Sequence, residues 1–172
     1  RTGAAVRGDL HCAAPYFYMD FVQEKLPAIK KREGRVLADW FAPRMADSVR
    51  RTFVGERIDW VTYVPNWEKE GERVYNQARV LARRVSRELS LPLTDALYQI
   101  RPKERQHMLS AAERLRNVQN LYALRDEGGV ERVSGATVLL VDDIITTGST
   151  LLACAQALPG TRILGAAVAV TE

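Results

Sequence analysis

The chain has 172 residues, 47% of them hydrophobic and 27% charged, a composition typical of one globular domain with a single buried core. No uninterrupted apolar run reaches the length of a membrane span, and the amino terminus lacks the pattern of a secretion signal, so we expect a cytoplasmic protein without a membrane partner. The formal net charge of +4 suits an anionic ligand, but it also suits a weakly basic surface without one.

The cysteines and histidines are too few and too far apart for a disulfide framework or a zinc site. Cys12 and Cys154 are the cysteines of the chain, and His11 and His107 are its histidines. We therefore expect both cysteines to be small, buried hydrophobic residues.

The amino-terminal part predicts two helices, over residues 18–31 and 35–51. Pro27 and Pro43 argue against both, because proline cannot donate the backbone hydrogen bond that a helix interior needs. Aromatic residues cluster around the start of the first helix: Tyr16, Phe17, Tyr18 and Phe21. Their faces could stack on a planar base, but packing in the core is the favoured interpretation.

The middle of the chain predicts a strand, a helix and a further strand. Residues 57–65 are typical of a buried strand that ends at Pro65, and a charged segment follows it. Residues 76–90 have helical spacing, with one apolar stripe and several arginines mostly outside it. The stripe consists of Ala78, Leu81, Ala82, Val85 and Leu89, and the arginines are Arg83, Arg84 and Arg87. Residues 91–100 are typical of another strand.

Residues 99–117 are polar and basic, with almost no apolar period before Ser110. Ser110 and Glu113 match a capping box, which predicts a short helix that begins at Ala111. The segment 101–108 lacks the apolar side chains that would hold it against a core, so we expect a mobile loop there.

The carboxyl-terminal part predicts a strand, a turn, a helix and a second strand. Residues 137–141 are apolar on both alternations, as in a strand covered on both faces, and this favours a parallel sheet. A polar turn over residues 144–150 leads into helical spacing that Pro159 and Gly160 end, and a second apolar segment follows at 162–170. This order predicts an α/β fold, with a mainly parallel central sheet and helices on both faces.

Asp142 and Asp143 directly follow the predicted strand 137–141, at the sheet edge where open α/β proteins bind their ligands. A phosphoacceptor receiver domain does not fit, because too little chain follows the pair to complete that fold. A nucleotide-hydrolysing ATPase does not fit either, because the sequence contains no G-x-x-x-x-G-K-[ST] loop.

The residues after the aspartates indicate a third kind of site. They supply hydroxyl groups and a glycine just before a predicted helix: Thr146, Thr147, Gly148, Ser149 and Thr150. Backbone N–H groups at the start of a helix favour an anion such as phosphate. Carboxylates beside a phosphate suit the vicinal hydroxyls of a ribose, and they can help to hold a hydrated divalent cation. The sequence therefore predicts a site for a ribose that carries a 5-phosphate.

The stretch 141–150, "VDDIITTGST", closely resembles the phosphoribosyl diphosphate (PRPP) motif of the type I phosphoribosyltransferases. More narrowly, the chain resembles the ComF family of phosphoribosyltransferase-like proteins, some of which are associated with DNA uptake in competent bacteria. "VPNWEKEGERVYNQARVLA" and "ERQHMLSAAERLRNV" match with moderate specificity, and "CAAPYFYMDFVQEKLPAIKKREGR" matches loosely. The resemblance implies the type I phosphoribosyltransferase fold in one domain over residues 1–172, with residues 1–30 as the candidate small hood and first helix.

The resemblance also implies roles for individual residues. Asp142 and Asp143 would bind the ribose hydroxyls of PRPP and, through water, the implied cofactor Mg²⁺. The 5-phosphate would lie on the hydroxyl-rich turn formed by Thr146, Thr147, Gly148, Ser149 and Thr150. The pyrophosphate would meet Pro65, Asn66 and Arg73. Val74 stands where the family has a glycine, which puts in question how closely the backbone there approaches the ligand.

The implied reaction is displacement of pyrophosphate from C1 of the ribose by a nitrogen acceptor. Residues 99–110 correspond to the flexible loop that closes over such a site, and its cations would stabilise the departing pyrophosphate. Lys103 is the first candidate for this catalytic role, followed by Arg105 and Arg101, and a solvated basic loop is the equally supported alternative. The implied partners are PRPP and an unidentified nitrogen acceptor, and a homodimer is left open.

Two other functions stay open. A PRPP-binding regulator would keep the ligand site without transferase activity. A DNA-uptake accessory protein would bind single-stranded nucleic acid through arginines such as Arg83, Arg84, Arg87, Arg114 and Arg116. Because such binding needs exposed aromatic side chains among the cations, a solvated helix face is the favoured interpretation of these arginines.

Overall fold

The computed structural model describes residues 3–7, 9–29, 34–68, 74–102, 120–125 and 134–171. Its helices are α1 (Asp20–Ile29), α2 (Gly34–Thr52), α3 (Gln77–Leu89) and α6 (Ser149–Gln156). The longer strands are β1 (Gly3–Arg7), β2 (Leu10–Ala14), β4 (Trp60–Tyr63), β7 (Thr137–Val141) and β9 (Arg162–Ala166). The shorter strands are β3 (Tyr16–Phe17), β5 (Leu97–Gln99), β6 (Tyr122–Leu124), β8 (Ile144–Ile145) and β10 (Ala169–Val170). Within these ranges, no helix combines the length and the apolar character needed to cross a membrane.

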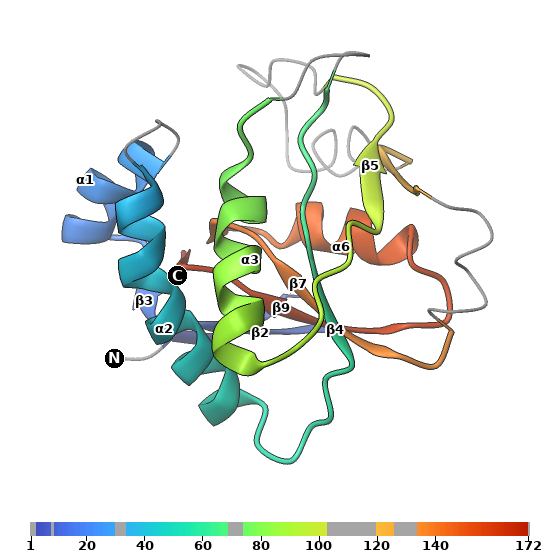
Figure 1. Ribbon diagram of the computed structural model, residues 1–172, viewed down its shortest axis with the longest axis horizontal. Helices are drawn as coiled ribbons and strands as arrows, with labels where there is room; N and C mark the ends of the chain where they lie inside the picture. Colours follow the sequence, from blue (N-terminus) through green and yellow to red (C-terminus); the bar gives the residue numbers. More distant parts are fainter. Residues whose placement is uncertain are drawn as a thin grey trace.

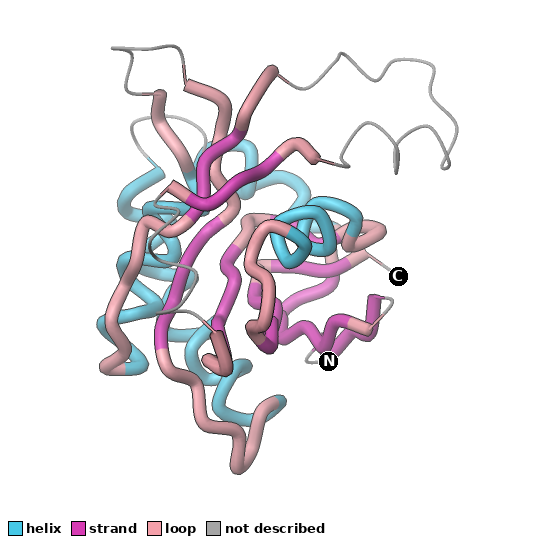
Figure 2. Tube along the Cα trace, turned by 90° about the vertical axis from the view of Figure 1, so that its right-hand side faces the viewer, coloured by secondary structure: helices cyan, strands magenta, loops and turns pink. Residues whose placement is uncertain are grey.

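The main sheet of the described residues has five strands in the order β1-β2-β9-β7-β4. Strands β2, β9, β7 and β4 pair in parallel, and β1 pairs antiparallel with β2 at one edge. Helices α1, α2 and α3 lie on one side of this sheet and α6 lies on the other, as Figures 1 and 2 show from two directions. The predicted α/β fold, with a mainly parallel sheet and helices on both faces, is therefore confirmed.

Strand β7 shows why the sheet needs a continuous apolar run. Val138 and Leu140 pack in the core beneath α6, whereas Leu139 and Val141 pack in the core beneath α2 and α3. All four side chains are fully buried. Successive side chains of a strand point to opposite faces, so a strand covered on both faces is apolar at every position. The two cysteines are buried as well, as predicted.

Helix α2 runs through Pro43, although the proline argued against a continuous helix. Phe41 and Met45 are buried in the core on either side of the proline, and tertiary packing of this kind outweighs local propensity. The guanidinium of Arg44 donates a hydrogen bond of 2.7 Å to the carbonyl of Trp40. In a regular helix the carbonyl of Asp39, the residue before Trp40, would accept a hydrogen bond from the N–H of residue 43. Pro43 has no N–H, so this helical hydrogen bond is missing.

The amino-terminal aromatic side chains pack against the body of the protein. The ring of Tyr16 stacks on that of Trp40, with centroids 6.1 Å apart. Tyr16 and Tyr18 are partly buried against the core beneath α2 and α3, and Phe17 is partly buried against the opposite core. The side chain of Phe21 lies outside the described part of the structure. These contacts favour core packing over a role as base-stacking platforms.

Residues 3–17 contribute strands that the sequence analysis did not predict. β1 and β2 extend the main sheet, and β3 joins β10 and β8 in a separate parallel sheet. Residues 10–14 have no β-branched side chain, so their pattern gives little strand signal. Gly165 of β9 makes the pairing fit, because a Cβ there would lie 2.7 Å from Sγ of Cys12.

The strand predicted over residues 91–100 is shorter than expected. Its ordered pairing is limited to β5, which forms an antiparallel ribbon with β6, apart from an isolated bridge between Leu93 and Val61. Asp95 and Thr94 are exposed, so this stretch has no continuous apolar face to bury in the main sheet.

Candidate functional site

The ends of β4 and β7 bring two predicted site segments together. These strands are parallel neighbours, with Tyr63 opposite Val141, so the residues that follow them leave the sheet side by side. The N–H of Val64 donates to the carbonyl of Val141 at 3.0 Å. The N–H of Asp142 donates to the carbonyl of Ala166 on β9 at 2.9 Å. The acidic pair therefore lies at the carboxyl edge of the sheet, as predicted.

Hydrogen bonds orient the acidic pair. Oδ1 of Asp143 accepts from the N–H of Ile144 at 2.8 Å, and Oδ2 of Asp143 accepts from Nε2 of Gln77 at 3.1 Å. Oδ1 of Asp142 accepts from the N–H of Asp143 at 2.8 Å. Both aspartates are half-buried. Because each carboxylate oxygen can accept more than one hydrogen bond, the pair keeps acceptor capacity for the hydroxyl groups of a ligand.

The hydroxyl-rich turn leads into the start of α6. Gly148 is the N-cap of this helix and has a φ of 77°, in the left-handed region that glycine adopts without steric cost. The hydroxyl of Thr147 donates to the hydroxyl of Ser149 at 3.0 Å and accepts from the N–H of Ser149 at 3.4 Å. Thr146 is exposed and Thr150 is half-buried. The first N–H groups of α6 and these hydroxyls therefore lie on one turn, a combination that suits a phosphate.

Asn76 joins the turn after β4 to α3. Its Oδ1 accepts from the N–H of Arg79 at 2.9 Å and caps the helix, while its Nδ2 donates to the carbonyl of Val64 at 3.0 Å. Nδ2 of Asn66 makes a second link, to the carbonyl of Tyr75 at 3.3 Å. Asn76 is only 6% exposed, so these bonds are shielded from water. The turn over residues 64–66 is thus fixed to the first turn of α3.

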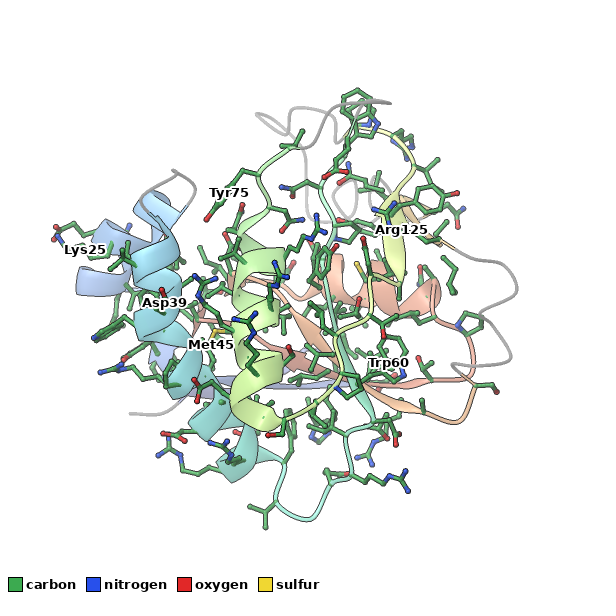
Figure 3. All side chains as sticks on the ribbon, in the orientation of Figure 1. Lys25, Asp39, Met45, Trp60, Tyr75 and Arg125 are labelled. Carbon is green, nitrogen blue, oxygen red and sulfur yellow. The ribbon has the colours of Figure 1, made fainter. Side chains whose placement is uncertain are left out.

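A small polar cavity of about 160 Å³ adjoins this turn. Pro65, Arg79, Asp95 and Arg125 are among the residues that line it. Nε of Arg125 forms an ion pair with Oδ1 of Asp95 at 3.1 Å. Figure 3 shows Arg125 toward the upper end of the molecule, above Trp60 at the start of β4. Because Tyr63 at the end of β4 also lines the cavity and pairs with Val141, the cavity belongs to the same end of the sheet as the acidic pair.

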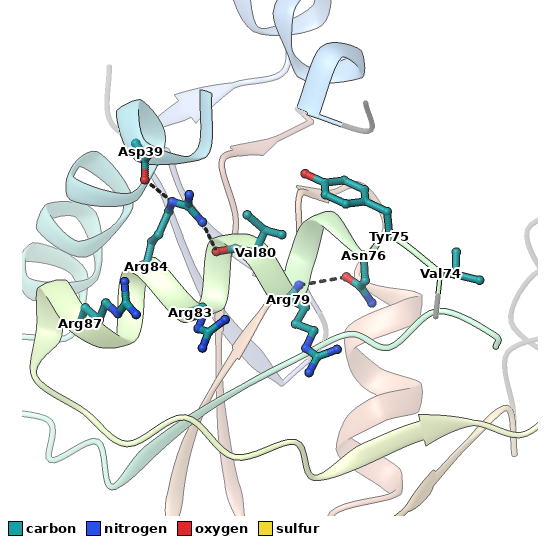
Figure 4. Close-up of a pocket in the computed structure, with 9 residues that line it drawn as sticks. All are labelled: Asp39, Val74, Tyr75, Asn76, Arg79, Val80, Arg83, Arg84 and Arg87. Carbon is teal, nitrogen blue, oxygen red and sulfur yellow. Dashed lines mark hydrogen bonds and ion pairs between the residues drawn. The ribbon is translucent and has the colours of Figure 1, made fainter. Parts of the chain in front are cut away.

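A larger groove of about 600 Å³ runs along the outer side of α3 toward α2. Figure 4 shows the charged residues that line it: Asp39, Arg79, Arg83, Arg84 and Arg87. The guanidinium of Arg84 forms a hydrogen bond and an ion pair with Asp39, and this contact lowers the pKa of the Asp39 carboxyl. Within the described ranges, no ion pair involves Arg79, Arg83 or Arg87. The groove is therefore basic, and Asn76 and Arg79 line both it and the small cavity.

Several predicted site residues lie outside the described residues: Arg73, Lys103, Arg105 and the capping box at Ser110 and Glu113. Arg101 is described and exposed, two residues beyond the end of β5. Among the described residues its carbonyl accepts a hydrogen bond from Gln99, and its catalytic role stays a prediction.

The donor set at the acidic pair fits a hydrated Mg²⁺. In the described ranges, no three side chains of His, Cys, Asp or Glu gather into a metal cluster. The carboxylates of Asp142 and Asp143 are hard oxygen donors, and Mg²⁺ commonly combines one or two such groups with water and substrate phosphates. The residues present are therefore compatible with a cation that arrives with a phosphorylated ligand.

The sequence analysis did not single out Gln77, which bonds to Asp143, or Arg79 and Asp95, which line the small cavity. The helix cap at Asn76 carried a local signal, because asparagine is among the preferred N-cap residues. The bond between Gln77 and Asp143 carried none, because the two residues are 66 positions apart and meet only in the folded chain.

The chain is similar to a known domain family and to several known proteins. The family model described as "Phosphoribosyl transferase domain" matches residues 74–171. The DNA utilization protein YhgH of Escherichia coli K12 is 35% identical over 111 residues, which cover 63% of this chain and 47% of that protein. Competence protein F of Haemophilus influenzae is 38% identical over 87 residues, which cover 48% of this chain and 36% of that protein. A crystal structure of adenine phosphoribosyltransferase aligns with 71% of this chain and 68% of its own, at a TM-score of 0.43 and 14% identity.

The chain thus spans less than half the length of the relatives that it matches. The family model covers more than half of the chain and includes β7, the acidic pair, the hydroxyl-rich turn and α6. The chain belongs to the family of the phosphoribosyl transferase domain and has the type I phosphoribosyltransferase fold, and the two relatives support its resemblance to the ComF family.

Proposed function

We propose that the chain is a cytoplasmic protein that binds PRPP with Mg²⁺ and transfers the phosphoribosyl group to a nitrogen acceptor. The observation that carries this proposal is the meeting of the acidic pair and the turn after β4 at one edge of a parallel sheet, beside a hydroxyl-rich helix start. Each part suits one part of PRPP: carboxylates for the ribose hydroxyls, and N–H and hydroxyl groups for the phosphates. Membership of the family supports the same ligand.

In this proposal the parts of PRPP lie along the sheet edge. Asp142 and Asp143 accept hydrogen bonds from the ribose hydroxyls. The 5-phosphate binds to the turn formed by Thr146, Thr147, Gly148, Ser149 and Thr150. The pyrophosphate meets Pro65, Asn66 and Arg73. Asn76 supports this arrangement, because it holds the turn after β4 against the start of α3.

The proposed reaction breaks the bond between C1 and the pyrophosphate oxygen and forms a bond between C1 and the acceptor nitrogen, which then loses a proton. Mg²⁺, when bound with PRPP, supplies positive charge to the departing pyrophosphate. We assign Lys103, Arg105 and Arg101 to the same task, on the resemblance alone. Charge that develops on pyrophosphate in the transition state is stabilised by a nearby cation, typically by about 3 kcal/mol.

Release of pyrophosphate with a panel of nitrogen acceptors tests the proposal. Purine and pyrimidine bases and ammonia are each mixed with the protein, PRPP and Mg²⁺, and Asp143→Asn serves as the inactive control. We expect turnover with at least one acceptor, and Lys103→Ala should slow it by about a hundredfold while it weakens PRPP binding much less. Binding of PRPP without turnover for any acceptor would favour a PRPP-binding regulator instead.

A second candidate function rests on the basic groove along α3. Arg79, Arg83 and Arg87 line it without an ion pair among the described residues, and they could contact the phosphates of single-stranded nucleic acid. The names of the relatives, a DNA utilization protein and a competence protein, are consistent with such a role. Binding of a labelled oligonucleotide at increasing salt concentration tests this function. The variant Arg83→Glu is compared with the control Arg57→Glu, which makes the same change of charge in the loop before β4. Equal binding by the two variants would remove the groove from consideration.

A further inference from the structure

We propose that Gln77 is a positioning residue that fixes the direction of the Asp143 carboxylate toward the ribose hydroxyls of PRPP. This inference rests on the proposed PRPP site, and it adds a residue that neither the acidic pair nor the hydroxyl-rich turn contains. Gln77 is the first residue of α3, whereas Asp143 follows β7, so the contact joins two elements that are distant in the sequence.

The contact leaves the Asp143 carboxylate little rotational freedom. Nε2 of Gln77 donates to Oδ2 at 3.1 Å, and the N–H of Ile144 donates to Oδ1 at 2.8 Å. Each oxygen of the carboxylate is therefore held by a separate donor. Rotation of the carboxylate would break both bonds, so the remaining lone pairs keep one direction before the ligand arrives. Because the acceptor is already oriented, the side chain loses little conformational entropy when the ligand binds.

Gln77 is itself held in place by its neighbours. Asn76, directly before it, is buried and bonds both to the N–H of Arg79 and to the carbonyl of Val64. Ala78, directly after it, is buried in the core beneath α2 and α3. The backbone at Gln77 is thus fixed on both sides, and its side chain is half-buried. A donor on a fixed backbone can set the direction of its acceptor.

The chemical character of the amide suits this role. A guanidinium or ammonium group at this position would neutralise Asp143 and compete with the ribose hydroxyls and the cation for its oxygens. A carboxylate would repel Asp143. A neutral N–H donor orients the carboxylate and leaves its negative charge available to the ligand. Glutamine meets both requirements and has the length to reach Asp143 from the start of α3.

Separate titrations with PRPP, ribose 5-phosphate and pyrophosphate, each with Mg²⁺, test this role. We expect Gln77→Leu to weaken the binding of PRPP and of ribose 5-phosphate by about tenfold, which is the effect of one hydrogen bond to a charged group. The binding of pyrophosphate should stay unchanged. Gln156→Leu, on the exposed end of α6, is the matched control and should change none of the three. Circular dichroism melts check that each variant is folded.

Gln77→Glu keeps the shape of the side chain and provides a second test. At pH 8 the introduced carboxylate should repel Asp143, so Gln77→Glu should weaken the binding of ribose 5-phosphate more than Gln77→Leu does. Affinity of Gln77→Glu for ribose 5-phosphate equal to that of the unmodified chain at this pH would contradict the positioning role.

The outcomes separate this inference from the proposed function. Equal affinity of Gln77→Leu and the unmodified chain for ribose 5-phosphate would overturn the inference and leave the PRPP site standing. An equal loss for all three ligands would indicate a general structural effect and would also overturn it. Failure of the unmodified chain to bind PRPP would overturn the proposed function, and the inference with it.

Discussion

Asp143 is the residue on which the proposed ligand site depends most. Its carboxylate accepts from Gln77 and Ile144 and lies half-buried at the sheet edge. Asp143→Asn removes the negative charge and an acceptor, so PRPP binding should weaken by about 1–3 kcal/mol in calorimetry. Asp47→Asn on α2, where Asp47 pairs with Arg50, is a control of equal chemistry and should leave binding unchanged. An unaltered dissociation constant for Asp143→Asn would count against the ribose assignment.

Gly148 allows a test of the phosphate turn at the level of one residue. Its φ of 77° is costly for any residue with a Cβ, so Gly148→Ala should destabilise the fold by about 1–2 kcal/mol and disturb the turn. Gly55 has a φ of 80° in the loop before β4, so Gly55→Ala should destabilise the fold similarly. PRPP binding should weaken in Gly148→Ala and stay unchanged in Gly55→Ala. Equal binding by both variants would remove the turn from the site.

The residue scale also shows what the sequence could predict about the site. Asp142, Asp143 and the hydroxyl-rich turn are contiguous, so one stretch of sequence contained their pattern. Gln77 and Asp143 are 66 positions apart, and no local signal links them. Such partners depend on how α3 packs against the sheet, which a single sequence does not specify.

At the scale of elements, α3 connects the two halves of the site. Asn76→Ala removes the N-cap and leaves the carbonyl of Val64 without its side-chain donor. We expect a loss of about 2–3 kcal/mol in the free energy of unfolding, measured with urea, because both groups are buried. Asn76→Asp retains an acceptor for the helix cap, so its free energy of unfolding should fall by less. A loss below about 0.5 kcal/mol for Asn76→Ala would show that α3 starts independently of this residue.

The elements also differ in how well their patterns predicted them. The stripe predicted for α3 is correct, since Ala78, Leu81, Ala82 and Val85 are buried and Leu89 packs against the core. In a long segment with helical spacing, the apolar stripe predicts which side chains are buried. Strands β3, β5, β6, β8 and β10 have two or three residues each, too few for any period, and they exist because neighbouring segments supply partners.

At the scale of the whole molecule, two buried tyrosines should lower the stability of the fold at alkaline pH. Burial raises the pKa of Tyr63, and a hydrogen bond to Asp95 raises it further. Burial also raises the pKa of Tyr122, with the nearby Cys154 and Asp142 adding to the effect. Since an unfolded tyrosine ionises near pH 10 and these two do so only at higher pH, their contribution to stability is complete below about pH 10.

The free energy of unfolding should therefore fall as the pH rises above about 10. Urea unfolding between pH 9 and pH 11 measures this slope. Tyr122→Phe removes one of the ionising groups, so it should make the slope shallower, and Tyr98→Phe, at an exposed position, should not. Identical slopes for the two variants would contradict the account of Tyr122.

The fold class was predictable because its signals are consistent with one another. The apolar run at 137–141, the following helix and the second apolar segment require a parallel pair, which β7 and β9 form. The order of the remaining strands was not predictable, because β2 and β4 reach the sheet from separate parts of the chain. The basic segment around Lys103 lies outside the described residues, so its place in the mechanism stays a prediction.

Isothermal titration of the chain with PRPP, with and without Mg²⁺, tests the central claim most directly. The proposed site predicts a dissociation constant in the micromolar range with Mg²⁺ and much weaker binding without it, because the cation offsets the charge of the pyrophosphate beside two aspartates. Asp143→Asn should abolish most of that difference. Absence of heat with the unmodified, folded chain at millimolar PRPP would contradict the assignment of this sheet edge as a PRPP site.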